Sequence, residues 1–229
     1  VPAWLSDYSN ALMVEDNANL VRWMHVTPWK QDVESCDRVG LIQAMPAGDA
    51  ERDVEGQQWN QRKELMRDAI IYNRNNPSII FYECGNESIS REHMLEMREI
   101  RDKYDFYGGR AIGSREMLDI RESEYGGEML YINKSAHSPF WAMEYCRDEG
   151  LRKYWDDYSY PFHKEGEGNK GFHSAMANKM VAGDASPYNH NQDQFTVELV
   201  RRWYDYWRER AGSGQRISSG GVKIIFSDS

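Results

Sequence analysis

Two glutamates follow short apolar runs, and together they could supply an acid, a base and a nucleophile. Glu87 ends the run SIIFYECGNE at residues 78–87, and Glu144 lies near the end of PFWAMEY at residues 139–145. Both runs are rich in β-branched or aromatic residues and are flanked by turn residues, which predicts buried strands. If both strands belong to one parallel barrel, their carboxylates face the mouth where active sites are built. One could then protonate a glycosidic oxygen while the other attacks the anomeric carbon, as in retaining glycoside hydrolysis.

Strand and helix patterns alternate along the chain and would position these glutamates. Apolar periodicity predicts helices over residues 2–16, 31–39, 59–75, 90–104 and 195–210. It predicts strands over residues 19–26, 41–45, 79–84, 110–117, 124–132, 140–146 and 222–226. Such alternation indicates a parallel α/β sheet. Seven strands that begin after a helix predict a (β/α)₈ TIM barrel lacking its first strand, in one catalytic domain over residues 1–229.

Two of the predicted helices carry apolar residues at helical spacing, and these residues are expected to face the core. In the first helix they are Trp4, Leu5, Tyr8, Leu12 and Met13. In the helix over residues 59–75 they are Leu65, Met66, Ala69, Ile70 and Tyr72.

The composition is that of a globular protein and excludes several classes of function. Apolar residues make up 40% of the chain and charged residues 28%, and no apolar run approaches the roughly 18 residues of a membrane span. The net charge of -9 argues against binding to a nucleic-acid backbone. Three cysteines, Cys36, Cys84 and Cys146, are odd in number and predict buried free thiols.

Five motifs occur in a fixed order along the chain. They are NLVRWMHVTP at 19–28, CDRVGL at 36–41, NPSII through GNE at 76–87, MEY at 143–145 and GGVKIIFSD at 220–228. Together they resemble the catalytic barrel of glycoside hydrolase family 2, the family of bacterial β-galactosidases, β-glucuronidases and β-mannosidases. The resemblance implies a retaining exo-β-glycosidase and favours β-galactosides, with β-glucuronidase or β-mannosidase as the alternative. A carbohydrate-binding protein without turnover is the alternative class.

The resemblance also implies roles for the residues that carry it. Glu87 is similar to the general acid/base and Glu144 to the nucleophile. Arg22 would lie near Glu144 and keep it ionised, and Asn86 would hydrogen-bond the sugar 2-hydroxyl. The competing interpretations are structural: a helix cap for Glu87 and ordinary ion pairs for Glu144 and Arg22.

Further residues are expected to bind substrate. His25 resembles a histidine that lines the sugar site, and Tyr125 resembles a tyrosine that donates to the nucleophile, with Tyr131 as the alternative. His137 would reach the pocket. Trp155 begins an aromatic segment that either stacks on sugars or packs a long loop.

Three places depart from the family pattern or match it weakly. Met45 stands where many relatives carry an acidic residue, so no metal and no other cofactor is expected. Ile224 stands where relatives usually have Trp. The GNKG segment at residues 168–171 is similar to the Asn/Lys element by which β-glucuronidases bind a carboxylate, although a charged glycine-rich loop is the simpler interpretation.

Both ends of the chain suggest a piece of a longer protein, with β-sandwich domains before it. An oligo- or polysaccharide is the expected substrate, a homo-oligomer is left open, and a bacterial periplasmic or secreted protein is favoured over a cytoplasmic one. Without a first barrel strand, the strands at residues 19–26 and 222–226 would lack their shared neighbour. The isolated piece is therefore expected to be less stable than its parent, and weakly active or inactive.

Overall fold

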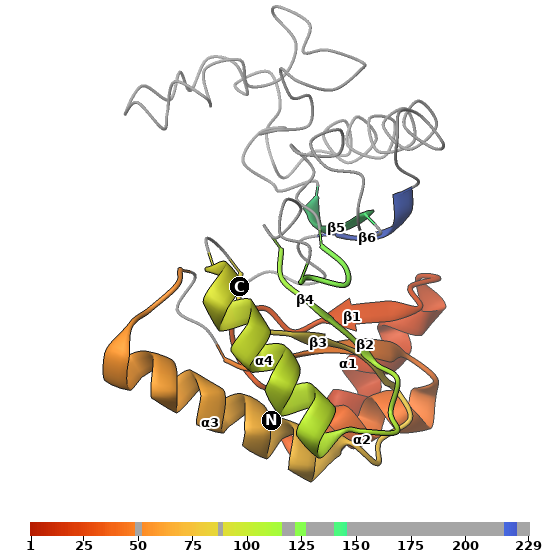
Figure 1. Ribbon diagram of the computed structural model, residues 1–229. Coiled ribbons are helices and arrows are strands. Elements are labelled where there is room, and N and C mark those ends of the chain that lie inside the picture. The colour runs from red at the N-terminus through yellow and green to blue at the C-terminus, as the bar shows by residue number, and fades with distance from the viewer. Residues whose placement is uncertain (49–51, 87–88, 116–121, 127–139, 146–217, 224–229) are drawn as a thin grey trace, which may run out of the picture. The chain divides into compact units, whose positions relative to one another are not determined.

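The computed structural model describes residues 1–48, 52–86, 89–115, 122–126, 140–145 and 218–223 (Figure 1). The chain divides into two compact units, Val1–Gly126 and Gly127–Ser229. Among the described residues, no helix is long and apolar enough to span a membrane.

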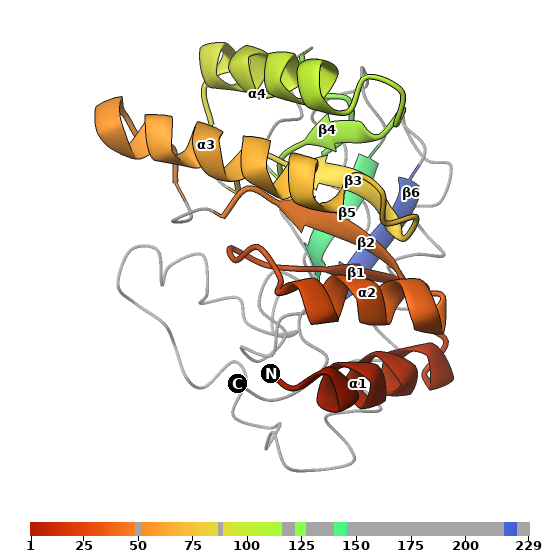
Figure 2. The same ribbon diagram turned by 90° about the horizontal axis from the view of Figure 1, so that it is seen from below.

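The first unit alternates helices and parallel strands. Its elements are α1 (Ala3–Glu15), β1 (Leu20–Arg22), α2 (Lys30–Val39), β2 (Ile42–Pro46), α3 (Gly56–Asn73), β3 (Ile79–Glu83), α4 (Arg91–Tyr104) and β4 (Ala111–Gly113). The strands form a four-stranded sheet in the order β1-β2-β3-β4, and every neighbouring pair is parallel. Helices α2, α3 and α4 lie on one face of this sheet, with α1 beside α2, and Figure 2 looks onto that helical layer. The predicted α/β alternation and parallel sheet are confirmed for this unit.

The observed strands differ in length from the predicted ones. A strand ends where its backbone hydrogen bonds to the neighbouring strand end, which need not be where its apolar residues end. The run at residues 19–26 was expected to be one strand, but β1 ends at Arg22. Beyond it, His25 has a positive φ of 65°, which a strand cannot accommodate. The strand expected at residues 110–117 is only Ala111–Gly113. Of the strand expected at 124–132, the described part contributes a single bridge between Gly113 and Tyr125.

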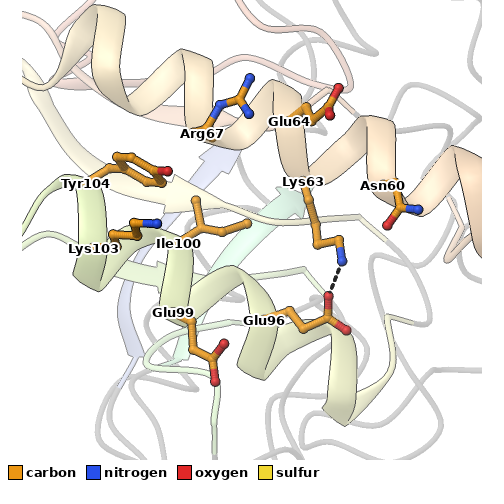
Figure 3. A pocket seen from close by; sticks show the side chains of 9 residues that line it. All are labelled: Asn60, Lys63, Glu64, Arg67, Glu96, Glu99, Ile100, Lys103 and Tyr104. Atoms are coloured by element: carbon orange, nitrogen blue, oxygen red, sulfur yellow. Dashed lines mark hydrogen bonds and ion pairs between the residues drawn. The ribbon is translucent and has the colours of Figure 1, made fainter.

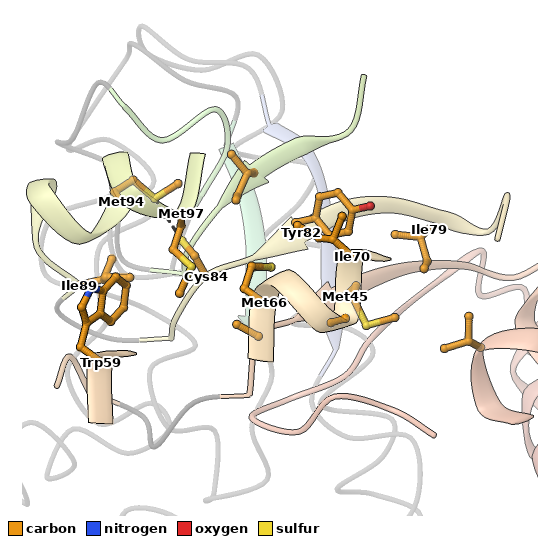
Figure 4. Close-up of a cluster of buried hydrophobic side chains, with 14 residues drawn as sticks. Met45, Trp59, Met66, Ile70, Ile79, Tyr82, Cys84, Ile89, Met94 and Met97 are labelled. Carbon is orange, nitrogen blue, oxygen red and sulfur yellow. Dashed lines mark hydrogen bonds between the residues drawn. The ribbon is translucent and has the colours of Figure 1, made fainter. Parts of the chain in front are cut away.

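The core of the first unit lies between the sheet and helices α2, α3 and α4 (Figure 4). It is rich in methionine and includes Val33, Met45, Ala47, Trp59, Met66, Ala69, Ile70, Ile79, Tyr82, Cys84, Ile89, Met94, Met97 and Ile112. The two cysteines in the described residues, Cys36 and Cys84, are buried thiols, as predicted. Burial raises the pKa of the Cys36 thiol to about 12, so it is an inert core residue.

The prediction that the apolar residues of helix α1 face the core is wrong for Trp4 and Tyr8. Trp4 and Tyr8 are 68% and 61% exposed, whereas Ser6 and Asn10 are buried. The Ser6 hydroxyl donates to Asp32 of α2, and the Asn10 amide donates to Ser35 at 3.0 Å. Helix α1 therefore packs on its neighbouring helix through hydrogen bonds rather than on the sheet.

The predicted apolar face of helix α3 is correct only in part. Met66, Ala69 and Ile70 are buried, but Leu65 and Tyr72 are exposed. The buried stripe follows the helical period, and positions 65 and 72 fall outside it.

Two motifs that carry the family resemblance meet at the start of β3. The Asp37 carboxylate accepts a hydrogen bond from the main-chain N–H of Ser78 at 3.0 Å, and others from the Ser78 hydroxyl and the Asn76 amide. Lys30 Nζ donates to Asn76 Oδ1 at 2.7 Å. The CDRVGL and NPSII motifs thus hold the amino end of β3 in place, at the opposite end of the strand from Glu83.

Replacing Asp37 with Ala should destabilise the fold. The change leaves three partly buried donors without their acceptor, which is expected to lower the free energy of unfolding by about 2–4 kcal/mol. Urea unfolding of the full-length protein measures this. Asp68→Ala is the matched control, because that side chain is 63% exposed and pairs with neighbouring Arg67. Equal stability of the two variants would contradict this structural role of Asp37.

The described part of the second unit is a parallel pair, β5 (Phe140–Tyr145) and β6 (Ser218–Lys223). The final strand was expected over residues 222–226, but pairing begins at Ser218. A Cβ on Gly220 would lie 2.5 Å from the Trp141 ring, so glycine is required where that ring covers β6. The helix expected at residues 195–210 and Cys146 lie outside the described residues.

Candidate active site

Polar side chains gather at the carboxyl ends of β1 and β3. Arg22 is the last residue of β1 and Glu83 the last of β3, with β2 between them in the sheet. Arg22 lies opposite Ala44, which lies opposite Phe81. Met45 and Tyr82 belong to the helix-side core, so their strand neighbours face the other side of the sheet. The small Ala44 side chain lets Arg22 reach across β2.

Arg22 and Glu83 form a buried, two-point ion pair. Arg22 Nε donates to Glu83 Oε2 at 2.7 Å, and Arg22 Nη2 donates to Glu83 Oε1. The side chains are 2% and 0% exposed. Two parallel hydrogen bonds fix the plane of the guanidinium, and each charge compensates the other where water cannot.

The same guanidinium also holds Asn86. Arg22 Nη2 donates to Asn86 Oδ1 at 2.7 Å, and Asn86 is 2% exposed. The Ser114 hydroxyl donates to the main-chain carbonyl of Gly85 and, at 3.4 Å, to that of Asn86. Asn86 is therefore anchored through both its side chain and its backbone, directly before Glu87 in the sequence.

Tyr125 lies beside this cluster, and its predicted bond to Glu144 stays a prediction because the Glu144 side chain is outside the described residues. Its hydroxyl donates to the main-chain carbonyl of Tyr82 at 2.9 Å, and its ring packs on Phe81 at a centroid distance of 4.8 Å. A phenol has one proton, so donation to Glu144 would require the Tyr82 bond to break. Burial, followed by the nearby Glu83 charge, raises the pKa of Tyr125 well above its usual value, which keeps it a neutral donor.

Close approach of Tyr125 to the sheet depends on Gly113. A Cβ on Gly113 would lie 2.2 Å from the Tyr125 carbonyl oxygen, so any side chain there would force the two segments apart.

Glu124, directly before Tyr125, accepts a hydrogen bond from Arg101 at 2.7 Å. Burial raises the pKa of Glu124, but the hydrogen bonds from Arg101 and the Ile112 N–H outweigh burial and leave that pKa lowered.

A second polar group braces the segment that follows Glu87. Asp53 accepts from the Ser90 main-chain N–H at 2.9 Å and contacts His93 Nδ1 at 2.8 Å. The His93 ring stacks on Trp59 with centroids 3.8 Å apart. Ser90 also caps α4 by accepting from the His93 N–H, as its position in the sequence predicts. The start of α4 is thereby tied to the β2–α3 connection.

The structure describes only some of the other predicted site residues. His25 follows β1 and is partly buried. Glu144 lies on β5, but its side chain is outside the description, and the predicted contact with Arg22 stays a prediction. The residues that lie wholly outside the described part are Glu87, Tyr131, His137, Trp155, Ile224 and the segment 168–171.

Glu83 is the site residue that motif matching did not single out. The available signal was a charged residue inside an otherwise apolar strand, because a buried carboxylate requires a partner. Met45, where relatives carry an acidic residue, is fully buried in the core. Within the described residues, no three His, Cys, Asp or Glu side chains lie together as metal ligands.

A surface groove between α3 and α4 is separate from this cluster (Figure 3). It has a volume of about 510 Å³ and is lined by Asn60, Lys63, Glu64, Arg67, Glu96, Glu99, Ile100, Lys103 and Tyr104. Lys63 pairs with Glu96 across it, and this hydrogen bond, opposed by burial, lowers the pKa of Glu96. The paired charges make it a solvated helix–helix surface.

Comparisons with known proteins extend over the whole chain. No family model matches it. A β-glucuronidase from Formosa agariphila is 29% identical over 234 residues, a match that covers 100% of this chain and 22% of that protein. The solved structure of a β-glucuronidase from glycoside hydrolase family 2 is 27% identical with a TM-score of 0.73, covering 100% of this chain and 23% of that one.

The predicted resemblance to glycoside hydrolase family 2 is confirmed. A family 2 β-galacturonidase from Eisenbergiella tayi, solved with galacturonate bound, shares the fold at a TM-score of 0.65 and 17% identity, over 99% of this chain and 41% of its own. The chain spans less than a quarter of the length of these two β-glucuronidases.

Proposed function

We propose that the full-length protein is a retaining exo-β-glycosidase that acts on β-linked uronic acids, most simply a β-glucuronidase. The observation that carries this proposal is the match of the whole chain to β-glucuronidases at 29% and 27% identity. The expectation of a β-galactosidase receives no such support, and the comparisons favour its alternative. Residues 1–229 would supply the catalytic (β/α)₈ barrel except for its first strand, with that strand and the remaining domains elsewhere in the protein.

The proposed chemistry uses two glutamates. Glu87 donates its proton to the glycosidic oxygen while the Glu144 carboxylate attacks the anomeric carbon, so the bond to the leaving group breaks and a glycosyl ester forms. Glu87, now ionised, takes a proton from water as that water attacks the same carbon and releases Glu144. The two carboxyl groups are expected about 5–5.5 Å apart.

The anchored cluster supports this proposal from the side of binding. Asn86 precedes Glu87 and is held rigidly by Arg22, so an amide donor and the acid/base would move as one segment. Rigid placement of such groups is worth large rate factors, since a misplacement of about 1 Å can slow a reaction about 100-fold. A uronic acid adds a carboxylate that needs a positive partner; Lys170 with Asn169 is the candidate carried over from the family resemblance.

A panel of 4-nitrophenyl β-glycosides tests the choice of sugar. On the full-length protein, we expect β-glucuronide or β-galacturonide to exceed β-galactoside, β-glucoside and β-mannoside in kcat/KM by at least about 100-fold, because a site built to bind the sugar carboxylate is left with an unpaired polar partner by a sugar that lacks it. A preference for the β-galactoside would overturn the uronic-acid assignment while leaving the glycosidase mechanism intact.

A further inference from the structure

Glu83 is a buried carboxylate that the two-glutamate mechanism does not use. It ends β3, lies four residues before Glu87 and binds Arg22 through both carboxylate oxygens. We propose that Glu83 is a positioning residue, which holds the Arg22 guanidinium so that Arg22 fixes the Asn86 amide with its nitrogen presented to a substrate oxygen. This inference rests on the proposed function and deepens it.

The direction of the Asn86 amide follows from the chemistry of arginine. A guanidinium has donors but no acceptor, so the Asn86 atom that lies 2.7 Å from Arg22 Nη2 must be the carbonyl oxygen. The amide nitrogen of Asn86 then points away from Arg22. Within the part of the chain that the structure describes, it has no hydrogen-bond partner. Asn86 is therefore set to act as a donor, and a sugar oxygen is the acceptor it would meet.

Glu83 determines which hydrogens of Arg22 remain for Asn86. Nη2 carries two hydrogens, and one is used by Glu83 Oε1 while the other is used by Asn86 Oδ1. The Nε bond to Glu83 Oε2 at 2.7 Å locks the guanidinium plane. A Gln at position 83 would turn an amide N–H₂ toward one of these donors, and the plane would have to rotate. Asn86 would then lose its fixed orientation although no group of the substrate touches position 83.

A double-mutant cycle on the full-length protein tests this chain of contacts. With 4-nitrophenyl β-glucuronide, E83Q and N86A should each lower kcat by about 10- to 100-fold and leave KM within about threefold, because positioning is expressed mainly in the transition state. E83Q in the N86A background should add less than about threefold, since Glu83 acts through Asn86. E64Q, at an exposed carboxylate on α3, is the matched carboxylate control and should leave kcat unchanged.

The alternatives give distinct results. Multiplicative effects of E83Q and N86A, or an E83Q enzyme with normal kcat, would overturn the inference. If E83Q lowers the thermal stability so far that it does not fold, R22K takes its place in the cycle, because lysine keeps the charge and removes the two-point bond. A wild-type protein that hydrolyses no glycoside in the panel would overturn the proposed function instead. The crystal structure of E83Q then decides the inference alone: a turned Asn86 amide supports it, and an unchanged amide overturns it.

Discussion

The variant Glu144→Gln is expected to lose turnover of every glycoside, with kcat reduced by about 10⁴-fold or more, the scale of loss when a covalent nucleophile is removed. The amide keeps the size of the carboxylate but cannot form a stable ester with the anomeric carbon. The loss should therefore be independent of the leaving group. Initial rates with 4-nitrophenyl β-glucuronide on the full-length protein measure it, with Glu64→Gln, an exposed carboxylate on α3, as the control.

A covalent trap separates the nucleophile from other roles of Glu144. A 2-fluoro β-glucuronide with a good leaving group should label the wild-type protein at Glu144, and peptide mass spectrometry should find the sugar on the peptide that contains residues 140–145. The E144Q protein should stay unlabelled. A folded wild-type protein that takes up no label and still binds the sugar would favour the other class considered, a carbohydrate-binding protein without turnover.

The order of elements could be predicted from the sequence because periodicity is a local property. Helix α2 and strand β3 fall within two residues of the spans expected from apolar spacing and from the turn residues Gly40 and Pro77. The parallel arrangement followed from alternation alone. Strand ends could not be predicted, because they depend on which backbone groups find partners across the sheet. Ser218 and Gly220, polar or small, pair with β5 although neither belongs to an apolar run.

Side-chain partners were harder to predict than elements, because they join residues distant in sequence. The polar contact of α1 with α2 depends on Ser6 and Asn10, which apolar spacing ignores. The resemblance placed Arg22 near the nucleophile, which stays a prediction, but it did not predict that Arg22 also binds Glu83, 61 residues away, and Asn86. The pair could have been suspected from charge balance, since Arg22 and Glu83 are each a charged residue within a predicted buried strand.

The buried pair changes how the site would hold its charges. If Arg22 stood alone near the active glutamates, its full positive charge would favour the ionised form of any nearby carboxyl group. Bound to Glu83, Arg22 donates in fixed directions. Such a group orients the neighbouring Asn86 side chain as well as carrying charge.

The variant Glu87→Gln should lose activity to a degree set by the leaving group. Loss of the general acid is expected to lower kcat by about 10²–10⁴-fold for alkyl or sugar leaving groups, which depart only when protonated. For 2,4-dinitrophenyl β-glucuronide, which needs no proton, formation of the glycosyl ester should stay close to wild type. Pre-steady-state measurements should then show a burst of dinitrophenol, because the second step also lacks its general base.

Added azide provides the decisive measurement for Glu87. Azide needs no general base, so it can attack the anomeric carbon of the glycosyl ester, release the Glu144 carboxylate and form a β-glucuronosyl azide. Azide should therefore raise the steady-state rate of E87Q and have no effect on E144Q. An E87Q protein that loses the same factor with every leaving group, and that azide does not rescue, would show that Glu87 is not the acid/base and would return it to the role of a structural carboxylate before α4.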